Sequence, residues 1–193
     1  MGQRGAGWTA VPTIPASPRV DSVRATLPPV VIRPARRNDV SKLSAFFIEA
    51  WKEAGPSALG FTGATDEAIA AISSEEFLTR RLATPTIHMT VAEEGRSIIG
   101  FASVKRVGPR EAELSAIVVL ESATGRGVGT RLLRKAIDAA RKRGFTSILV
   151  KTEVKNERAI RFYRNNGFTE SGKALEKIGA SKVSLRLMER RLR

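Results

Sequence analysis

The sequence contains no cysteine and only one histidine. The lack of cysteine excludes disulfide bonds, thiol catalysis and zinc held by cysteine. A single histidine excludes a metal site built from several imidazoles. No apolar run approaches the ~18 residues that a membrane-spanning helix needs, so we expect a cytoplasmic protein with no membrane partner and no metal.

Acidic residues are also scarce. The 193 residues hold 19 Asp and Glu against 33 Lys and Arg, a formal net charge of +14. Residues 111–193 carry most of the excess, with 19 basic and 9 acidic side chains. A basic field attracts phosphates, nucleic acids or acidic surfaces. A basic surface with no specific partner accounts for the charge equally well.

Proline is unevenly spread, and five of the nine prolines lie in residues 1–29. No helical or strand period survives in that stretch, so we predict a disordered Pro-rich N-terminal extension. An organellar transit peptide is an alternative, although the prolines disfavour its amphipathic helix. Residues 30–193 have the length of one domain.

The first half of that domain reads as a strand, helices and further strands. Val30–Ile32 predicts a strand, and Asn38 or Asp39 is expected to cap a helix that ends at Gly55-Pro56. Its apolar face is predicted to contain Val40, Leu43, Phe47, Ala50, Trp51 and Ala54. A loop over Ser57–Gly63 precedes one or two helices, with a capping box at Ser73 and Glu76.

Alternating apolar residues then predict an antiparallel meander of three strands, at 86–93, 97–107 and 111–120. A glycine-rich loop follows, then a helix over 128–143, a strand over 147–152 and a helix over 156–165. Terminal strands are expected near 168–173 and 182–188. This order predicts an α/β fold whose mixed central β-sheet is flanked by about four helices.

The glycine loop runs from Thr124 to Thr130 and opens the long helix. Glycines let a ligand approach the backbone, and a helix N-terminus favours anions. The loop does not fit a P-loop, because it lacks the lysine of that motif. It does not fit a dinucleotide-binding fingerprint either, because the third glycine of that motif is missing. A tight strand-to-helix turn without a ligand is the plain alternative.

Two motifs resemble those of the GNAT superfamily of N-acetyltransferases. Gly127 and Gly129 match the glycines of its Arg/Gln-x-x-Gly-x-Gly/Ala motif, while Thr124 departs from the usual Arg or Gln. The segment from Asn156 to Phe168 matches its Asn-x-x-Ala-x-x-x-Tyr-x-x-x-Gly-Phe element. The resemblance covers essentially residues 30–193 and implies a GNAT fold with splayed strands where acetyl-CoA binds.

The same resemblance implies an acyltransferase that uses acetyl-CoA as cosubstrate. It places the pantetheine arm beside the third meander strand, the phosphates at the glycine loop, and another contact at the second motif. The implied cofactor-binding residues are Ile117, Val118, Val119, Thr124, Gly125, Arg126, Gly127, Val128, Gly129, Thr130, Asn156 and Tyr163. Arg131 and Arg164 are further candidates for contacts to phosphate.

Direct attack by an amine on a thioester needs a base, oxyanion donors and an acid for the leaving thiolate. Tyr163, the only tyrosine, occupies the family's acid position, and we favour that role over the alternative of a packing aromatic beside Phe162. Glu113 corresponds to the general base of histone-type members, against the alternative of an exposed strand residue. Glu153 or a chain of waters could replace it, and His88 reads as structural or exposed.

The acceptor stays open among a small-molecule amine, a protein N-terminus and a lysine side chain. The resemblance assigns its binding to Phe47–Phe61 and the loop Leu175–Lys182, and the net charge disfavours strongly cationic acceptors. A CoA-binding protein without catalysis and a basic protein associated with nucleic acid or the ribosome are rival functions. Eleven aromatic residues without a basic stacking platform weaken the second rival. A homodimer is compatible with the sequence.

Overall fold

The computed structural model describes residues 28–55, 65–178 and 181–192. The predicted extension therefore falls almost wholly outside the described residues, as does the predicted loop Ser57–Gly63. The division into an extension and one domain stays a prediction. None of the described helices is both long enough and apolar enough to cross a membrane.

Seven strands and five α-helices make up the described part of the chain. The strands are β1 (Val30–Pro34), β2 (Ile87–Glu94), β3 (Ser97–Arg106), β4 (Glu111–Val119), β5 (Ser147–Glu153), β6 (Thr169–Ile178) and β7 (Ser181–Arg191). The helices are α1 (Val40–Ala54), α2 (Asp66–Ser73), α3 (Glu75–Ala83), α4 (Val128–Lys142) and α5 (Glu157–Asn165). Two short 3-10 helices, η1 (Arg37–Asp39) and η3 (Glu121–Ala123), precede α1 and the glycine loop.

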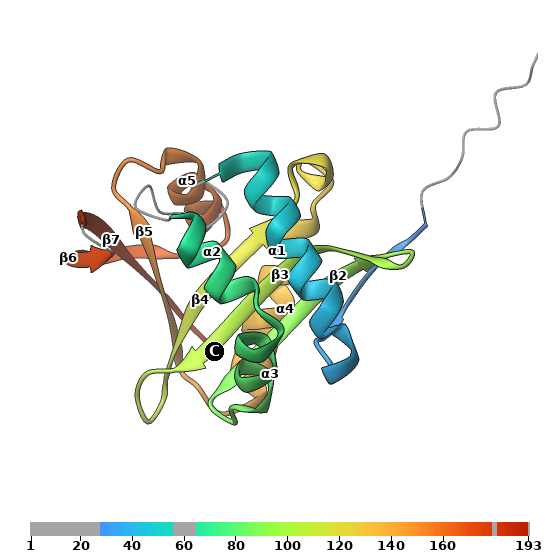
Figure 1. Cartoon of the computed structure of the whole chain (residues 1–193). Coiled ribbons are helices and arrows are strands. Elements are labelled where there is room, and N and C mark those ends of the chain that lie inside the picture. The colour runs from blue at the N-terminus through green and yellow to red at the C-terminus, as the bar shows by residue number, and fades with distance from the viewer. Residues whose placement is uncertain (1–27, 56–64, 179–180, 193) are drawn as a thin grey trace, which may run out of the picture.

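The strands form one sheet in the order β1-β2-β3-β4-β5-β7-β6. Only the β4–β5 pair is parallel, and every other neighbouring pair is antiparallel. Helices α1, α2 and α3 lie in front of the sheet in Figure 1, and α4 lies behind it. The mixed sheet with its antiparallel meander is confirmed, with five α-helices where about four were expected.

The apolar face of α4 lies against the sheet. Every apolar residue that helical spacing assigns to it is buried: Val128, Leu132, Leu133, Ala136, Ile137 and Ala140. This stripe packs against β2, β3 and β4. Burial of so continuous a stripe fixes the helix, and with it the glycine loop at its N-terminus, on the back of the sheet.

The details of α1 correct the expected face. Phe46 is buried although the spacing argument passed over it, and its ring packs edge-on against Phe47 at 5.3 Å between centroids. Ala54 is exposed and Trp51 is only partly buried, with its indole N–H donating to the Asp66 carboxylate of α2 at 2.8 Å. Gly55 ends the helix with a left-handed φ of 55°.

One expected cap is wrong in position, and the other stands at the expected residue but makes no side-chain cap bond. Ser74 caps α3 by accepting from the Phe77 N–H, so Ser73 instead ends α2 and donates to the Ile69 carbonyl. Asp39 precedes α1, but its side chain makes no cap hydrogen bond to that helix. The terminal strands are also longer than predicted, so most of the expected loop Leu175–Lys182 is strand.

Asp39 instead stands at the centre of a buried ion cluster. Its carboxylate accepts two hydrogen bonds from the Arg33 guanidinium and one from the Arg36 N–H, all at 2.7 Å. Arg33 also pairs with Glu93, which Lys42 of α1 reaches at 2.8 Å. The hydrogen bonds from Arg33 hold the pKa of Asp39 below its ordinary value. The cluster joins β1, β2 and α1.

Asp39→Asn should lower the free energy of unfolding at pH 7 by about 2 kcal/mol or more, because charged hydrogen bonds are lost in a buried place. The folded pKa of Asp39 lies below its unfolded value of ~3.9. The contribution is therefore complete above that value and disappears as pH falls through the folded pKa. Measured by urea unfolding, the free energy of unfolding of the variant should fall less steeply with decreasing pH than that of the wild type.

Asp138→Asn is the matched control. Asp138 is exposed and, in the described part of the chain, pairs with Arg141 alone at 3.3 Å, so its loss should change stability by less than about 0.5 kcal/mol. Equal effects of the two substitutions would contradict a structural role for the buried cluster.

Candidate functional site

Strands β4 and β5 pair over only three residue pairs. The register runs from Glu111 opposite Ser147 to Glu113 opposite Leu149. β4 continues to Val119 and β5 to Glu153, so the two strands separate over their C-terminal halves, as Figure 1 shows. The splayed strands that the resemblance implies are therefore present, beyond Glu113 and Leu149. The β5-facing edge of β4 has no strand partner beyond Glu113 within the described residues.

A β-bulge explains why the strands separate there. The register of β3 and β4 passes from Ser103 opposite Ala116 to Val104 opposite Leu114, which leaves Ser115 as the extra residue. Its hydroxyl donates to the Ser103 carbonyl at 3.2 Å. A bulge bends its strand, and this one comes two residues after the last β4–β5 pair. β4 thus turns away from β5 where the opening begins.

The glycine loop joins the open end of β4 to α4. Gly125 and Gly127 both adopt φ of +73°, in the left-handed region that side chains other than glycine rarely enter. Gly127 is also the residue immediately before the first turn of α4. These two glycines therefore let the chain reverse from strand to helix within a few residues.

The loop leaves a run of backbone donors unused. Among the described residues, no N–H from Gly125 to Thr130 donates to a protein acceptor, whereas the Arg131 N–H bonds to the Gly127 carbonyl. The helix dipole adds partial positive charge at the same place. Unpaired amides and the dipole together favour an anionic group such as a phosphate.

Carboxylates that sequence reasoning missed anchor both sides of the loop. Glu53 of α1 accepts the Glu121 N–H at 2.7 Å, and Glu94 of β2 forms an ion pair with Arg126. The hydrogen bond from Arg126 lowers the pKa of Glu94. Neither carboxylate lies in a recognisable motif, so only the folded chain reveals these contacts.

The side chains of the predicted loop residues are mostly engaged. The Thr124 hydroxyl donates to the Glu121 carbonyl at 2.8 Å, and Arg131 donates to the Val30 carbonyl at 2.8 Å. Val128 is buried in the core. With Arg126 paired to Glu94, the loop offers a ligand mainly its backbone N–H groups.

Gly129 brings three elements together. A Cβ placed on it would lie 3.7 Å from Val119 of β4 and 3.7 Å from the Phe162 ring of α5. Tyr163 follows Phe162, and their rings pack edge-on at 5.4 Å between centroids. The end of β4, the start of α4 and the aromatic turn of α5 therefore meet at the open end of the split.

Tyr163 is buried, with 6% of its surface exposed. Its ring also packs against Phe168 at 5.6 Å between centroids. Burial raises the pKa of the phenol well above its ordinary value, so the hydroxyl keeps its proton and remains a donor. A neutral phenol in an apolar setting suits the predicted acid, and the ring contacts serve packing as well.

Asn156 has a clear structural role, because its side-chain oxygen caps α5 by accepting the Ala159 N–H at 3.0 Å. This leaves its NH2 group as the donor for the predicted contact to the cosubstrate. Glu153, the reserve base, is buried at the end of β5. Both residues stand on the β5 side of the opening.

Glu113 lies at the last β4–β5 pair and belongs to a chain of ion pairs. Lys105 of β3 approaches its carboxylate at 3.1 Å and Lys151 of β5 at 4.0 Å. Lys151 also meets Glu176 of β6 at 2.5 Å, and that hydrogen bond raises the pKa of Lys151. Glu113 is therefore not the exposed strand residue of the plain alternative, and the chain links four strands beside the split.

His88 lies apart from these residues, near the start of β2, and is half buried. Burial is the main cause that lowers its pKa, with Arg143 and Lys135 of the α4 segment adding repulsion. Within the described ranges, no group of three His, Asp or Glu side chains could hold a metal ion.

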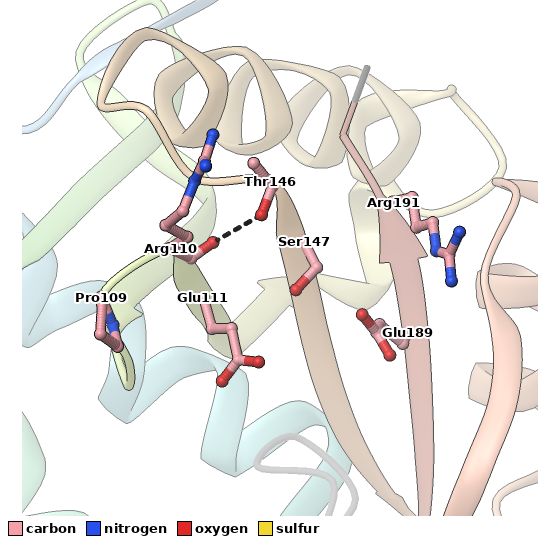
Figure 2. Close-up of a pocket in the computed structure, with 7 residues that line it drawn as sticks. All are labelled: Pro109, Arg110, Glu111, Thr146, Ser147, Glu189 and Arg191. Carbon is pink, nitrogen blue, oxygen red and sulfur yellow. Dashed lines mark hydrogen bonds between the residues drawn. The ribbon is translucent and has the colours of Figure 1, made fainter.

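An open hollow of about 530 Å³ lies at the other end of the sheet. Figure 2 shows it where β4 and β5 begin and β7 ends, with Glu111, Ser147 and Glu189 around it. The Thr146 hydroxyl donates to the Arg110 carbonyl beside it. Since the glycine loop follows the opposite end of β4, this hollow takes no part in the candidate site.

Gly127→Ala should lower the free energy of unfolding by about 1–2 kcal/mol, the cost of a left-handed conformation for an L-residue. Gly129→Ala should leave stability unchanged or raise it by up to ~1 kcal/mol, because alanine favours a helix and its Cβ meets only ordinary contacts at 3.7 Å. Urea unfolding compares the two variants. Equal losses at both positions would contradict this loop geometry.

Comparison with known proteins identifies the family and the fold. The model of the acetyltransferase (GNAT) family matches residues 46–168. N-alpha-acetyltransferase RimI of Mycobacterium tuberculosis is 38% identical over 96 residues, which are 48% of this chain and 59% of that protein. An IAA acetyltransferase of Azospirillum brasilense is 30% identical over 92 residues, 47% of this chain and 60% of the relative. The chain thus spans about three fifths of these relatives.

Solved structures agree on the fold. The PaiA N-acetyltransferase of Thermoplasma acidophilum, solved in complex with coenzyme A, superimposes with a TM-score of 0.67 at 22% identity, covering 84% of this chain and 99% of that one. The ribosomal-protein-alanine N-acetyltransferase of Brucella melitensis gives a TM-score of 0.68 at 23% identity, with the same coverage. Because the family model matches more than half of this chain, the chain belongs to the GNAT family of acetyltransferases.

Proposed function

We propose that the protein transfers an acetyl group from acetyl-CoA to a primary amine. The observation that carries this proposal is the split between β4 and β5, with a run of unused backbone donors at its open end. The unpaired edge of β4 can bond to an extended amide-containing ligand, and the loop can bond to phosphates. Acetyl-CoA contains both groups.

In this proposal the N–H groups from Gly125 to Thr130 hold the diphosphate, and the edge from Ile117 to Val119 holds the pantetheine arm. Val128 contributes only its N–H, because its side chain is buried. The Arg126 guanidinium can reach a phosphate only by sharing or leaving Glu94. Acetyl-CoA supplies the acyl group in activated, thioester form.

The reaction forms a bond from the amine nitrogen to the acetyl carbon and breaks the bond from that carbon to sulfur. The attacking amine loses a proton and the departing thiolate gains one. Tyr163, kept protonated by burial, is the proton donor in this scheme. The Val119 N–H donates to the carbonyl oxygen as negative charge develops, because the ladder in which the Leu120 N–H bonds to the Ile99 carbonyl directs the Val118 N–H to β3.

The base is assigned to Glu113, with Glu153 or water as alternatives. The contacts of Glu113 to Lys105 and Lys151 give it a second role, since they brace the strands on either side of it. A general base and a purely structural residue predict different pH–rate profiles, so this assignment can be tested directly.

The acceptor class remains a choice among a small amine, a protein N-terminus and a lysine. The match to RimI, named as an N-alpha-acetyltransferase, makes a protein α-amino group the first acceptor to test. Residues 56–64, part of the segment predicted to bind the acceptor, lie outside the described residues. The cytoplasmic location and a homodimer also stay predictions from the sequence.

Tyr163→Phe should reduce kcat by about 10²-fold or more, the usual contribution of a positioned acid, because the ring stays and only the hydroxyl is lost. Acetyl-CoA affinity, measured by calorimetry, should stay within about twofold of wild type. Release of free CoA with an α-amino peptide reports turnover. Unchanged turnover would remove Tyr163 from the mechanism. No turnover by wild type with α-amino, lysine or small amines would contradict the enzyme itself.

Glu113→Gln should remove the acid limb of the pH–rate profile if the carboxylate takes the proton from the amine. Glu111→Gln, two residues earlier on the same strand and away from Lys151, is the matched control and should keep that limb. A Glu113→Gln variant that only melts earlier, with its pH profile intact, would show that this residue braces the strands and is not the base.

A further inference from the structure

The outer face of α4 carries a row of positive charge that the proposed reaction does not use. Its exposed basic residues are Arg131, Arg134, Lys135, Arg141 and Lys142, with Arg143 just after the helix. Asp138 is the one acidic residue on this face, and it pairs with Arg141. Fifteen residues of helix span about 22 Å.

This row ends at a small hollow of about 200 Å³. The hollow is lined by Pro85, Thr86, Arg106, Arg143 and Phe145, and so by two arginines and no carboxylate. The Arg106 guanidinium lies over the Phe145 ring, 5.1 Å from its centroid. Arg143 donates to the Pro85 carbonyl at 3.5 Å. Both guanidinium groups are thus held at the rim of the hollow.

The positive charge at this place also acts on His88. It stands on β2 beneath this part of α4, where Arg143 and Lys135 add to burial in lowering its pKa. We define the cationic face as Arg106, Arg134, Lys135, Lys142 and Arg143. None of these five has an ion-pair partner among the residues that the structure describes.

The cationic face ends away from the acetyl-CoA site. The glycine loop precedes α4, whereas Arg143 follows its last turn and Arg106 closes β3 at the same end of the sheet. A ligand on the hollow would therefore leave the glycine loop free. Binding of the acetyl-CoA phosphates at the glycine loop therefore does not account for the positive charge here.

We propose that the cationic face binds the phosphodiester backbone of duplex nucleic acid. Arginine presents a planar fork that pairs with phosphate through two hydrogen bonds, and a row of such groups matches a row of phosphates. Outward positions of α4 hold no large apolar side chain that could anchor a protein partner. Backbone contacts also need no aromatic stacking platform, whose absence weakens single-strand binding.

Fluorescence anisotropy of the full chain with labelled 20-base-pair RNA and DNA duplexes of mixed sequence, from 50 to 200 mM salt, tests this proposal. The logarithm of the affinity should fall linearly with the logarithm of salt. Arg106→Gln with Arg143→Gln should weaken binding about tenfold or more at 100 mM salt, and reduce the salt slope on the DNA duplex by roughly 1.8. Binding of either duplex supports the proposal, and their ratio shows which nucleic acid is preferred.

Lys173→Gln with Lys177→Gln removes the same charge from exposed positions on β6 and should change affinity less than about twofold. Lys135→Gln with Lys142→Gln tests the face without disturbing Arg106 on Phe145 and should also weaken binding. Arg106→Lys with Arg143→Lys keeps the charge but loses the forks, so it should bind several-fold more weakly than wild type. Acetyl-CoA affinity should be unchanged in every variant.

Three results would overturn the proposal. They are no duplex binding at 50 mM salt, equal weakening by the β6 control, and equally tight binding of a polyglutamate peptide of matched charge. The first result would show that the cationic face does not bind a duplex. Either of the other two would show that the protein binds through its net charge and not through this face. Since acetyl-CoA affinity is measured in the same variants, failure of this inference is distinguishable from failure of the proposed function.

Discussion

The candidate site depends on one constraint, that β4 cannot follow β5 beyond Glu113 and Leu149. Parallel neighbours in the interior of a sheet normally satisfy each other's backbone groups along their length. Here the bulge at Ser115 bends β4, and the chain of ion pairs through Glu113 and Lys151 braces the strands where the pairing stops. The result is an unpaired strand edge inside the sheet, which is costly unless a ligand completes it.

The glycine loop turns that edge into a binding site. Gly125 and Gly127 accept left-handed geometry, and the buried stripe of α4 fixes the helix dipole behind the sheet. Glu53 and Glu94 hold the loop from two other elements. The amides are thus set before a ligand arrives, which reduces the entropy lost on binding.

Much of this arrangement was predictable from the sequence, because long periodic elements and paired motifs are strong local signals. The buried stripe of α4 follows its helical spacing, and the splay of β4 from β5 is confirmed. Contacts that join distant segments were not predictable. Neither Glu53 nor Glu94 has a motif, and Asp39 looked like a cap although Arg33, six residues earlier, takes its carboxylate. The bulge at Ser115 was not predictable, because the unbroken apolar run from Ala116 to Leu120 gives no alternation in which a change of face could be seen.

Amide hydrogen exchange with and without acetyl-CoA tests the central claim most directly, with ATP as a polyphosphate control. At ~100 times its dissociation constant, acetyl-CoA should slow exchange at the amides from Gly125 to Thr130 by up to about 100-fold. It should also slow the β4 amides between Ile117 and Val119 that β3 leaves unpaired. ATP should protect the loop alone. Protection of neither segment by acetyl-CoA, or protection only elsewhere in the chain, would contradict the account.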